Sequence, residues 1–319
     1  MPKIAIVDKI HQDGINLLKN NPKFECEIIE DLSKKNLISK LPDFDGITLR
    51  RGKIDAEILE KCKNLKVISR HGVGFDNVDV KILKKNNIKL LITATTTSVS
   101  PSEHIMFMIM NLAKGSGFFD KAVRNDEFES IMHMNHNTFE LSNKKILIIG
   151  FGRIGRKLIK RCLGFEMKVY AYDPYVEKNK IESFGGIKIE NLLDSLKEAD
   201  IISLSVPLTE ETQNMITLDE MKMMKKNAII INTSRGGIIN EKDLNEALNK
   251  KIIYGAGLDV FEKEPPDNNN PLLKNKKVVL SPHAATFTQE CLSKMSIETV
   301  QNIIDFFEGT PNKDSIVKI

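Results

Sequence analysis

Three polar residues in the second half of the sequence could together carry out chemistry on a small acid. Arg235 follows the apolar run AIIIN, Glu264 follows a predicted strand at 254–258, and His283 follows the run VVLS. An arginine offers a planar fork of donors to a carboxylate, and a histidine exchanges a proton with a carbonyl oxygen near neutral pH. A neighbouring carboxylate stabilises the protonated histidine. These side chain types suit acid–base chemistry on a 2-keto acid.

Each of these residues also has an ordinary structural interpretation. Arg235 could be a surface or helix-capping arginine, Glu264 a loop acid before Pro265, and His283 a core histidine with its hydrogen bonds satisfied. Taken singly, those interpretations are favoured over catalysis. The catalytic interpretation is favoured only when the three residues are combined with a cofactor signal.

A glycine-rich segment supplies that signal. The motif GFGRIG at 150–155 directly follows the apolar strand KILII and precedes a helical segment at 156–163. In such a motif the first glycine permits a tight turn, the second lets the backbone approach a pyrophosphate, and the third allows the helix to pack on the strand. The candidate cofactor contacts in the motif are Gly150, Gly152, Arg153, Ile154 and Gly155.

An acidic residue indicates which dinucleotide is bound. The next predicted strand, KVYAY, ends at Asp173, 18 residues after Gly155 (173 − 155). A carboxylate at this place accepts hydrogen bonds from the adenosine ribose hydroxyls and repels a ribose phosphate. The sequence therefore predicts NAD rather than NADP, and with it hydride transfer.

The elements that must position these residues alternate along the chain. Short β-branched runs are separated by segments such as 55–62 and 241–250, in which apolar residues recur three and four apart. Strands that are apolar on both faces and separated by helices indicate parallel sheets covered on each side. The predicted fold class is α/β, with two doubly wound parallel-sheet domains.

The position of the glycine motif divides the chain. A dinucleotide fold begins with the strand that feeds its phosphate loop, and no such loop follows the first strand at 3–7. A helix with Pro101 in its first turn would start the nucleotide domain, and a helix at about 288–307 would return the chain to the first domain. We expect a Rossmann-type NAD domain at 101–286, inserted in a flavodoxin-like substrate domain made of 1–100 and 287–319, with NAD in the cleft between them.

Composition excludes several other classes of protein. The 319 residues carry a formal net charge of +4, and the lysine pairs are scattered among acids, which argues against a nucleic-acid partner. The start of the chain lacks the apolar core of a signal peptide, and the apolar stretch at 105–110 is too short to span a bilayer, so we expect a soluble, cytoplasmic protein without a membrane partner. No metal site is expected, because His133 and His136 lack an acid at ligand spacing and the four cysteines form no CxxC pair: Cys26, Cys62, Cys162 and Cys291.

With these motifs in place, the sequence resembles the D-isomer-specific 2-hydroxyacid dehydrogenases over almost the whole chain. GFGRIG, NTSRGGIINEKDLNEAL, GAGLDVFEKEP and SPHAA occur in the order and spacing of that family. The resemblance implies that Arg235 binds and polarises the substrate, that Glu264 pairs with His283, and that His283 is the acid/base. It also implies cofactor contacts at the ends of later strands: Val206, Pro207, Thr233, Ser234 and, near the nicotinamide carboxamide, Asp259.

A loop in the first hundred residues resembles the family's substrate loop. In RHGVGFDNVD (70–79) the backbone N–H groups of Val73 and Gly74 could hold a substrate carboxylate; the alternative is a strand-to-helix turn capped by Asp76. Arg50 and Arg70 match positions where phosphoglycerate dehydrogenases keep arginines near the substrate, with Arg51 and Lys53 adding charge nearby. The alternative is that these are exposed surface charges.

The predicted function is reversible hydride transfer between NAD and a D-2-hydroxy acid, with 3-phosphoglycerate as the preferred substrate. We expect no regulatory domain after residue 319, so the resemblance is to the short phosphoglycerate dehydrogenases. Hydroxypyruvate or glyoxylate reduction is the alternative within the family. A rival of another class is an NAD(H)-sensing binding protein similar to the corepressors that share this scaffold. The resemblance also implies a homodimer through the nucleotide domain, with the apolar helix at 104–113 as a candidate surface.

Overall fold

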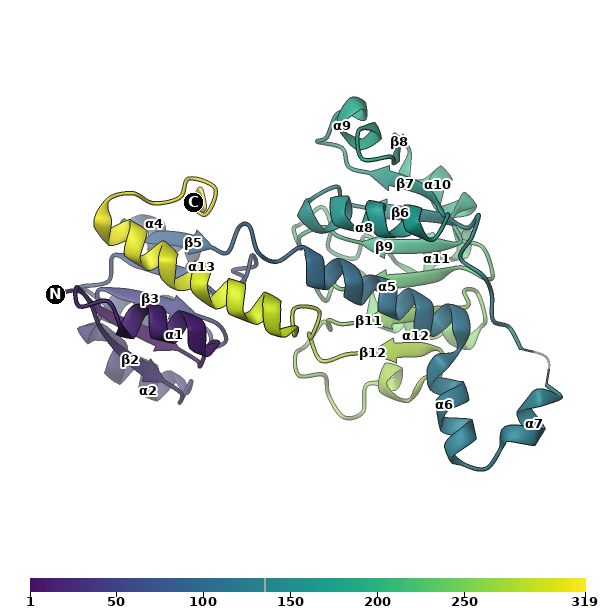
Figure 1. Ribbon diagram of the computed structural model, residues 1–319, viewed down its shortest axis with the longest axis horizontal. Helices are drawn as coiled ribbons and strands as arrows, with labels where there is room; N and C mark the ends of the chain where they lie inside the picture. Colours follow the sequence, from purple (N-terminus) through teal and green to yellow (C-terminus); the bar gives the residue numbers. More distant parts are fainter. Residues whose placement is uncertain (135) are drawn as a thin grey trace. The chain divides into compact units, whose positions relative to one another are not determined.

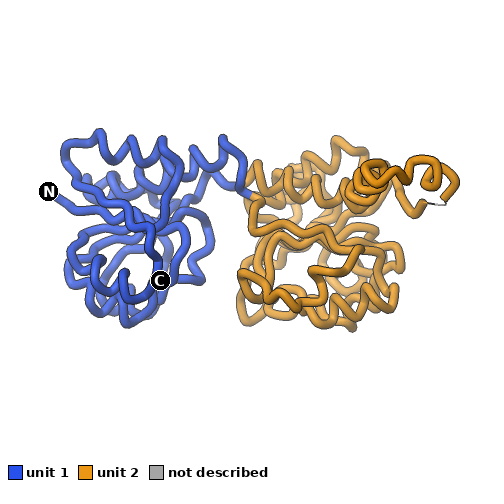
Figure 2. The backbone as a smooth tube through the Cα atoms, turned by 90° about the horizontal axis from the view of Figure 1, so that it is seen from below, with its two compact units in different colours: residues 1–97, 286–319 blue, residues 98–285 orange. Residues whose placement is uncertain are grey.

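The structure, a computed structural model, describes residues 1–134 and 136–319. The chain divides into two compact units (Figure 2). Unit 1 contains residues 1–97 and 286–319, and unit 2 contains residues 98–285.

Unit 1 is built on a five-stranded parallel sheet of order β2-β1-β3-β4-β5. This is the strand order of flavodoxin-like folds. The strands are β1 Lys3–Val7, β2 Glu25–Ile29, β3 Gly46–Leu49, β4 Val67–Arg70 and β5 Lys89–Ile92.

Helices cover both faces of this sheet because its inner strands are apolar on both sides. On one face Ile4 and Ile6 pack with Leu18 and Val300, and on the other Val7 packs with the remaining helices. The first face is covered by α1 Gln12–Lys19 and α13 Gln289–Glu308, and the second by α2 Lys34–Lys40, η1 Leu41–Asp43, α3 Ala56–Lys61 and α4 Val80–Lys85.

Unit 2 is built on a seven-stranded parallel sheet of order β12-β11-β10-β9-β6-β7-β8 (Figure 1). Counted from β6, this is the dinucleotide-binding order 3-2-1-4-5-6 extended by one strand. The strands are β6 Lys145–Ile149, β7 Lys168–Tyr172, β8 Ile187–Ile189, β9 Ile201–Leu204, β10 Ile229–Asn232, β11 Gly255–Leu258 and β12 Val278–Leu280.

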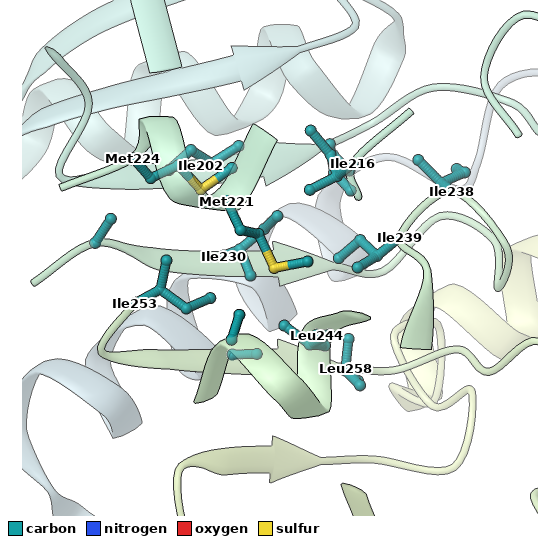
Figure 3. Close-up of a cluster of buried hydrophobic side chains, with 14 of the residues drawn as sticks. Ile202, Ile216, Met221, Met224, Ile230, Ile238, Ile239, Leu244, Ile253 and Leu258 are labelled. Carbon is teal, nitrogen blue, oxygen red and sulfur yellow. The ribbon is translucent and has the colours of Figure 1, made fainter. Parts of the chain in front are cut away.

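Two layers of helices enclose the sheet of unit 2. The helices α5 Val99–Lys114 and α8 Arg153–Gly164 pack side by side on one face (Figure 1). The opposite face packs on α10 Leu192–Glu198, α11 Leu218–Met223 and α12 Glu241–Asn249, and Figure 3 shows Ile202, Ile230 and Leu258 from its strands in contact with this layer. The remaining elements are α6 Ser116–Arg124, α7 Phe128–Met132, α9 Lys178–Glu182 and η2 Pro271–Lys274.

The helix α5 corrects one expectation. Most of its apolar side chains, including Ile105, Met108 and Ile109, are buried in the core of unit 2, and Phe107 is exposed. The segment 104–113 therefore holds its own sheet together, and the expectation that it offers a dimer surface was wrong for most of the helix.

Two further features of the described residues concern the helices and the cysteines. No helix among them combines the length and the apolar character needed to cross a membrane. The four cysteines are free thiols, and burial raises the pKa of Cys62 to about 11 and that of Cys162 to about 12, which keeps both protonated.

The strand order determines where a ligand can bind in unit 2. The order reverses between β6 and β9, and ligands of such sheets bind beyond the carboxyl ends of the strands at this point. β10, β11 and β12, which precede Arg235, Glu264 and His283, are consecutive neighbours in the same sheet. The sheet thus carries all three residues on the edge that can receive a cofactor.

Candidate active site

The glycine motif forms a tightly packed loop with one open position. A Cβ on Gly150 would lie 2.4 Å from the Ser205 carbonyl oxygen, and one on Gly155 would lie 2.3 Å from the Gly150 carbonyl oxygen. A Cβ on Gly152 would meet no atom within 4 Å. Gly150 also has φ +99°, which a residue with a side chain rarely adopts. The first and third glycines are therefore required by packing, while the second faces open space.

The helix α8 begins directly after this open position. Gly152 is its N-cap residue, and no described side chain caps it with a hydrogen bond. The first N–H groups of α8 therefore point at the space beside Gly152, where an anion such as a pyrophosphate is favoured. Arg153 is exposed at the first helical position, and Ile154 is partly buried against the core.

Asp173 lies beside the glycine loop. Its Oδ2 accepts a hydrogen bond from the Phe151 N–H at 2.8 Å, and its Oδ1 accepts one from the Tyr175 N–H at 3.0 Å. A carboxylate has about four lone-pair sites, so two remain for ribose hydroxyls. The structure fixes this carboxylate next to the loop, as a ribose contact requires.

The remaining predicted cofactor contacts lie at the ends of β9 and β10. The Ser234 hydroxyl donates to the Leu204 carbonyl at 2.7 Å and so ties the two strand ends together. The Pro207 carbonyl accepts from the Thr212 hydroxyl at 2.6 Å; Val206 is half-buried and Thr233 is buried. The open Gly152, the uncapped α8 and the fixed carboxylate together fit a bound NAD.

His283 and Glu264 are in direct contact. His283 Nδ1 lies 2.8 Å from Glu264 Oε2, and Glu264 Oε1 accepts a hydrogen bond from the Phe261 N–H at 3.1 Å. The side chains are 49% and 38% exposed, so both can be reached by a small molecule.

The protonation state of this pair follows from its surroundings. Partial burial of Glu264 raises the pKa of its carboxyl, but the hydrogen bond and charge of His283, the Phe261 N–H and the charge of Arg235 together lower that pKa below its ordinary value. An ionised carboxylate can only accept, so His283 Nδ1 carries the proton of their hydrogen bond. His283 Nε2 is then the ring atom that can exchange a proton with a substrate.

Arg235 lies in the loop next to the one that carries Glu264. Its Nη1 donates to the Ser234 carbonyl at 2.6 Å, and its carbonyl accepts from Asn232 at 2.8 Å. A Cβ on Gly236 would lie only 1.8 Å from the Phe261 carbonyl oxygen, so the two loops pack backbone to backbone. The structure thus brings Arg235, Glu264 and His283 together.

Asp259 is more enclosed than the sequence suggested. Its side chain is 0% exposed and accepts hydrogen bonds from the Ser281 hydroxyl at 2.5 Å, the Ala284 N–H at 2.7 Å and the Ala285 N–H at 3.0 Å. Asp259 therefore holds the loop that carries His283, while a contact with the nicotinamide carboxamide stays a prediction. Sequence reasoning assigned His104 to packing rather than to the site, but its Nε2 lies 2.8 Å from Ser281 Oγ and 3.6 Å from Asp259 Oδ1.

The predicted substrate residues lie in unit 1. Arg70 donates through Nε to Asn77 and through Nη1 to the carbonyls of Leu49, Arg50 and His71, at 2.7–3.0 Å. Its guanidinium therefore braces the loop after β4, in which Val73 is exposed and Gly74 half-buried.

The two neighbouring arginines are held by hydrogen bonds to nearby groups of unit 1. Arg50 donates to the Lys9 carbonyl at 3.0 Å, and Arg51 forms two hydrogen bonds with the buried Asp8 at 2.6 and 3.2 Å.

The helix α4 is capped by Asp79, whose carboxylate accepts from the N–H groups of the first turn. The suggestion that Asp76 caps this helix was wrong.

Fold and site define an α/β protein with two parallel sheets and a dinucleotide loop beside an arginine, a glutamate and a histidine. The profile of the family described as D-isomer specific 2-hydroxyacid dehydrogenase, NAD binding domain, matches residues 106–285. The chain belongs to the D-isomer-specific 2-hydroxyacid dehydrogenase family, which confirms the predicted family, fold class and cofactor NAD. Among the described residues, no group of histidine, cysteine, aspartate and glutamate side chains is arranged to hold a metal ion.

Curated relatives carry more than one name. The chain is 34% identical to a glyoxylate reductase of Korarchaeum cryptofilum, over 100% of this chain and 98% of the relative. It is 38% identical to a D-3-phosphoglycerate dehydrogenase of Methanocaldococcus jannaschii, over 91% of this chain. The chain spans 54% of that protein's length, and 59% of a D-3-phosphoglycerate dehydrogenase of Archaeoglobus fulgidus that is 33% identical.

Solved structures share the whole fold. The TT0316 protein of Thermus thermophilus is 25% identical, with a TM-score of 0.88 over 99% of this chain and 100% of that chain. The PH0520 protein of Pyrococcus horikoshii is 29% identical, with a TM-score of 0.83 over 100% of this chain and 95% of that chain.

Proposed function

We propose that this protein is an NAD-dependent dehydrogenase that interconverts a D-2-hydroxy acid and its 2-keto acid. The observation that supports this most directly is the 2.8 Å contact between His283 and Glu264, beside Arg235, on the sheet edge that also carries the glycine loop. Unit 2 is then the NAD-binding domain and unit 1 the substrate domain.

The mechanism follows from the three side chains. Arg235 binds the substrate carboxylate through its guanidinium and polarises the 2-oxygen. His283 Nε2 takes the hydroxyl proton during oxidation and returns it during reduction. Glu264 holds the imidazole through Nδ1 and stabilises its protonated form. Bound NAD supplies the acceptor for the hydride that leaves the 2-carbon.

Replacing the histidine tests this chemistry. His283→Ala removes the proton carrier, so we expect kcat to fall by about 10²- to 10⁴-fold. The dissociation constant for NADH, measured by fluorescence titration, should stay near the parent value, since His283 holds no part of the glycine loop. A large loss of NADH affinity would instead show that His283 has a structural role. Tight NADH binding by the parent protein without turnover of any 2-keto acid would favour the corepressor-like alternative.

For the substrate we propose 3-phosphoglycerate. Arg50 and Arg51 directly follow β3, at the carboxyl end of the unit 1 sheet and next to the loop with Val73 and Gly74. Asp8 is ion-paired with Arg51 and lies 3.9 Å from Arg50, so the two arginines and this carboxylate leave one net positive charge for a phosphate. The names of the relatives from Methanocaldococcus and Archaeoglobus support this choice. Hydroxypyruvate or glyoxylate is the second candidate, because the glyoxylate reductase from Korarchaeum matches over 98% of its length.

The two candidates differ in charge, so a comparison of substrates separates them. With 3-phosphoglycerate as the physiological substrate, kcat/KM should be higher for phosphorylated acids than for their unphosphorylated counterparts. Arg50→Ala should lower it by about tenfold for phosphorylated acids, a difference of about 1.4 kcal/mol, and change it little for glyoxylate. The matched control is Lys35→Ala, which removes an exposed charge on α2. Equal kcat/KM for both classes would support the reductase.

We also propose a homodimer that forms through unit 2 and works in the cytoplasm. The four free thiols are in keeping with a reducing compartment.

A further inference from the structure

Two polar side chains on one face of α5 contact the loop that carries His283. The Ser100 hydroxyl donates to the Ala285 carbonyl at 2.6 Å, and His104 Nε2 lies 2.8 Å from the Ser281 hydroxyl. Residues four apart on a helix share a face, so Ser100 and His104 hold the two ends of one loop, 281–285. Both contacts lie within unit 2.

The direction of the hydrogen bonds at Ser281 can be worked out. A serine hydroxyl has one proton, and the Ser281 hydroxyl donates it to Asp259 Oδ1 at 2.5 Å. Ser281 Oγ must therefore accept from His104, whose Nε2 carries a proton. The His104 side chain is 17% exposed and Asp259 is fully buried, so this chain of two hydrogen bonds is shielded from water along most of its length.

Asp259 in turn holds the backbone of His283 and of the two residues that follow it. Three consecutive N–H groups donate to Asp259: that of His283 to its carbonyl at 2.7 Å, and those of Ala284 and Ala285 to its carboxylate. His283 is held at φ +53°, which is uncommon for a residue with a side chain and persists only where the surroundings impose it. The direction of the imidazole therefore depends on Asp259 and on what holds Asp259.

We propose that His104 is a positioning residue for His283, acting through Ser281 and Asp259. This rests on the proposed role of His283 as the acid/base. The donor on His104 keeps the Ser281 hydroxyl turned toward Asp259, and the Asp259 carboxylate keeps residues 283–285 in the conformation that directs His283 Nδ1 to Glu264.

Two substitutions of His104 separate this role from packing. His104→Leu fills much of the space without a donor, and His104→Gln keeps an amide N–H near the place of Nε2. We expect His104→Leu to lower kcat by about tenfold or more, with KM and the NADH dissociation constant near the parent values. His104→Gln should recover most of that loss. Equal losses in the two variants, or no loss in His104→Leu, would overturn the proposal.

A second measurement does not depend on turnover. Amide hydrogen exchange, followed by mass spectrometry, should speed up for the peptide 281–287 in His104→Leu and in Ser281→Ala, and stay slow in His104→Gln. Glu103→Gln is the control, because Glu103 is exposed and ion-paired with Arg161, away from this loop. Unchanged exchange in both His104→Leu and Ser281→Ala would refute the positioning role. A parent protein that turns over no 2-keto acid would refute the proposed function instead.

Discussion

At the scale of single residues, His71 links the loop after β4 to the pH dependence of stability. It follows β4, is 5% exposed, and its Nδ1 lies 3.1 Å from the Thr299 hydroxyl. Burial lowers the pKa of His71 to about 3, assisted by the charges of Arg50 and Arg70 and opposed by that of Asp8. Between pH 6.5 and about pH 3 the folded protein therefore keeps this imidazole neutral, whereas an unfolded histidine is protonated.

The lowered pKa of His71 determines how the free energy of unfolding changes with pH. Between pH 6.5 and pH 3 the unfolded state binds more protons at this position than the folded state, so the free energy of unfolding falls as the pH falls. At pH 5 the loss from His71 relative to pH 7.5 should be about 2 kcal/mol.

Urea unfolding of the parent protein and of His71→Asn, at both pH values, measures this contribution. Asparagine does not titrate, so the variant should lose about 2 kcal/mol less than the parent between pH 7.5 and pH 5. His133→Asn, at an exposed histidine, should lose as much as the parent. The same loss in the parent and in His71→Asn would contradict the assignment.

Residue types predicted which polar side chains lie together better than they predicted which residues support them. Arg235, Glu264 and His283 could be selected because their chemistry is recognisable and each follows a strand. His104 could not, since its partner Ser281 lies 177 positions away in sequence and the contact exists only once α5 packs on the sheet. The i,i+4 spacing of Ser100 and His104, two polar residues at the start of a helix whose middle is apolar, was the available signal.

At the scale of elements, different glycines of the loop after β6 matter for stability and for the proposed binding of the cofactor. Gly155→Ala places a methyl group 2.3 Å from the Gly150 carbonyl, so α8 must move away from β6. Gly152 has φ −71° and open space around its Cβ position, so alanine fits there in the protein without cofactor. A methyl group at 152 would nevertheless occupy the space through which a pyrophosphate approaches the backbone.

The two substitutions should therefore affect different quantities: Gly155→Ala the free energy of unfolding, and Gly152→Ala the affinity for NADH. Gly155→Ala should lower the free energy of unfolding by about 1–3 kcal/mol, as overpacking does, in urea titrations. Gly152→Ala should change it by less than about 1 kcal/mol, yet weaken NADH binding by about tenfold or more in fluorescence titrations. Gly164→Ala, which has open space near the end of α8, is the control for both measurements. NADH binding that survives Gly152→Ala would contradict the proposed place of the pyrophosphate.

Element boundaries could be predicted where strands were apolar on both faces. The central strands β6, β9 and β10 are continuous buried runs and were recognised in the sequence. β2 was not, because it is an edge strand whose ECEII sequence alternates exposed charges with half-buried side chains. β8, with three residues, is too short to show any period.

At the scale of the whole molecule, the order of elements along the chain carried the most information. The chain leaves the five-stranded sheet after β5, completes the seven-stranded sheet, and returns with α13 to unit 1. The alternation of apolar strands with helices predicted the doubly wound sheets, and the place of GFGRIG predicted that the first hundred residues form a separate domain, because the first strand of a dinucleotide fold must precede its phosphate loop. The substrate could not be predicted with the same certainty, because phosphorylated and unphosphorylated acids call for the same catalytic group and differ in surface arginines.

The proposed homodimer leads to a prediction at this scale. Exposed apolar side chains gather on α6 and α7, which extend away from the sheet of unit 2 in Figures 1 and 2: Phe118, Val123, Phe128 and Met132, each more than half exposed. Burying them against a second copy would remove this apolar surface from water. Light scattering should therefore give twice 36.0 kDa for the parent protein.

Charges placed on this surface should separate the two copies. Phe128→Glu combined with Met132→Glu should yield the monomer mass and leave the fold intact by circular dichroism, because both side chains already face water in the single chain. The control Ile187→Glu changes another exposed apolar residue, on β8 and outside α6 and α7, and should remain dimeric. Since the surface is separate in sequence from Arg235, Glu264 and His283, the monomer should bind NADH as the dimer does. A dimer that survives both charges would place the contact elsewhere on unit 2, and a parent protein of 36.0 kDa in solution would refute the homodimer itself.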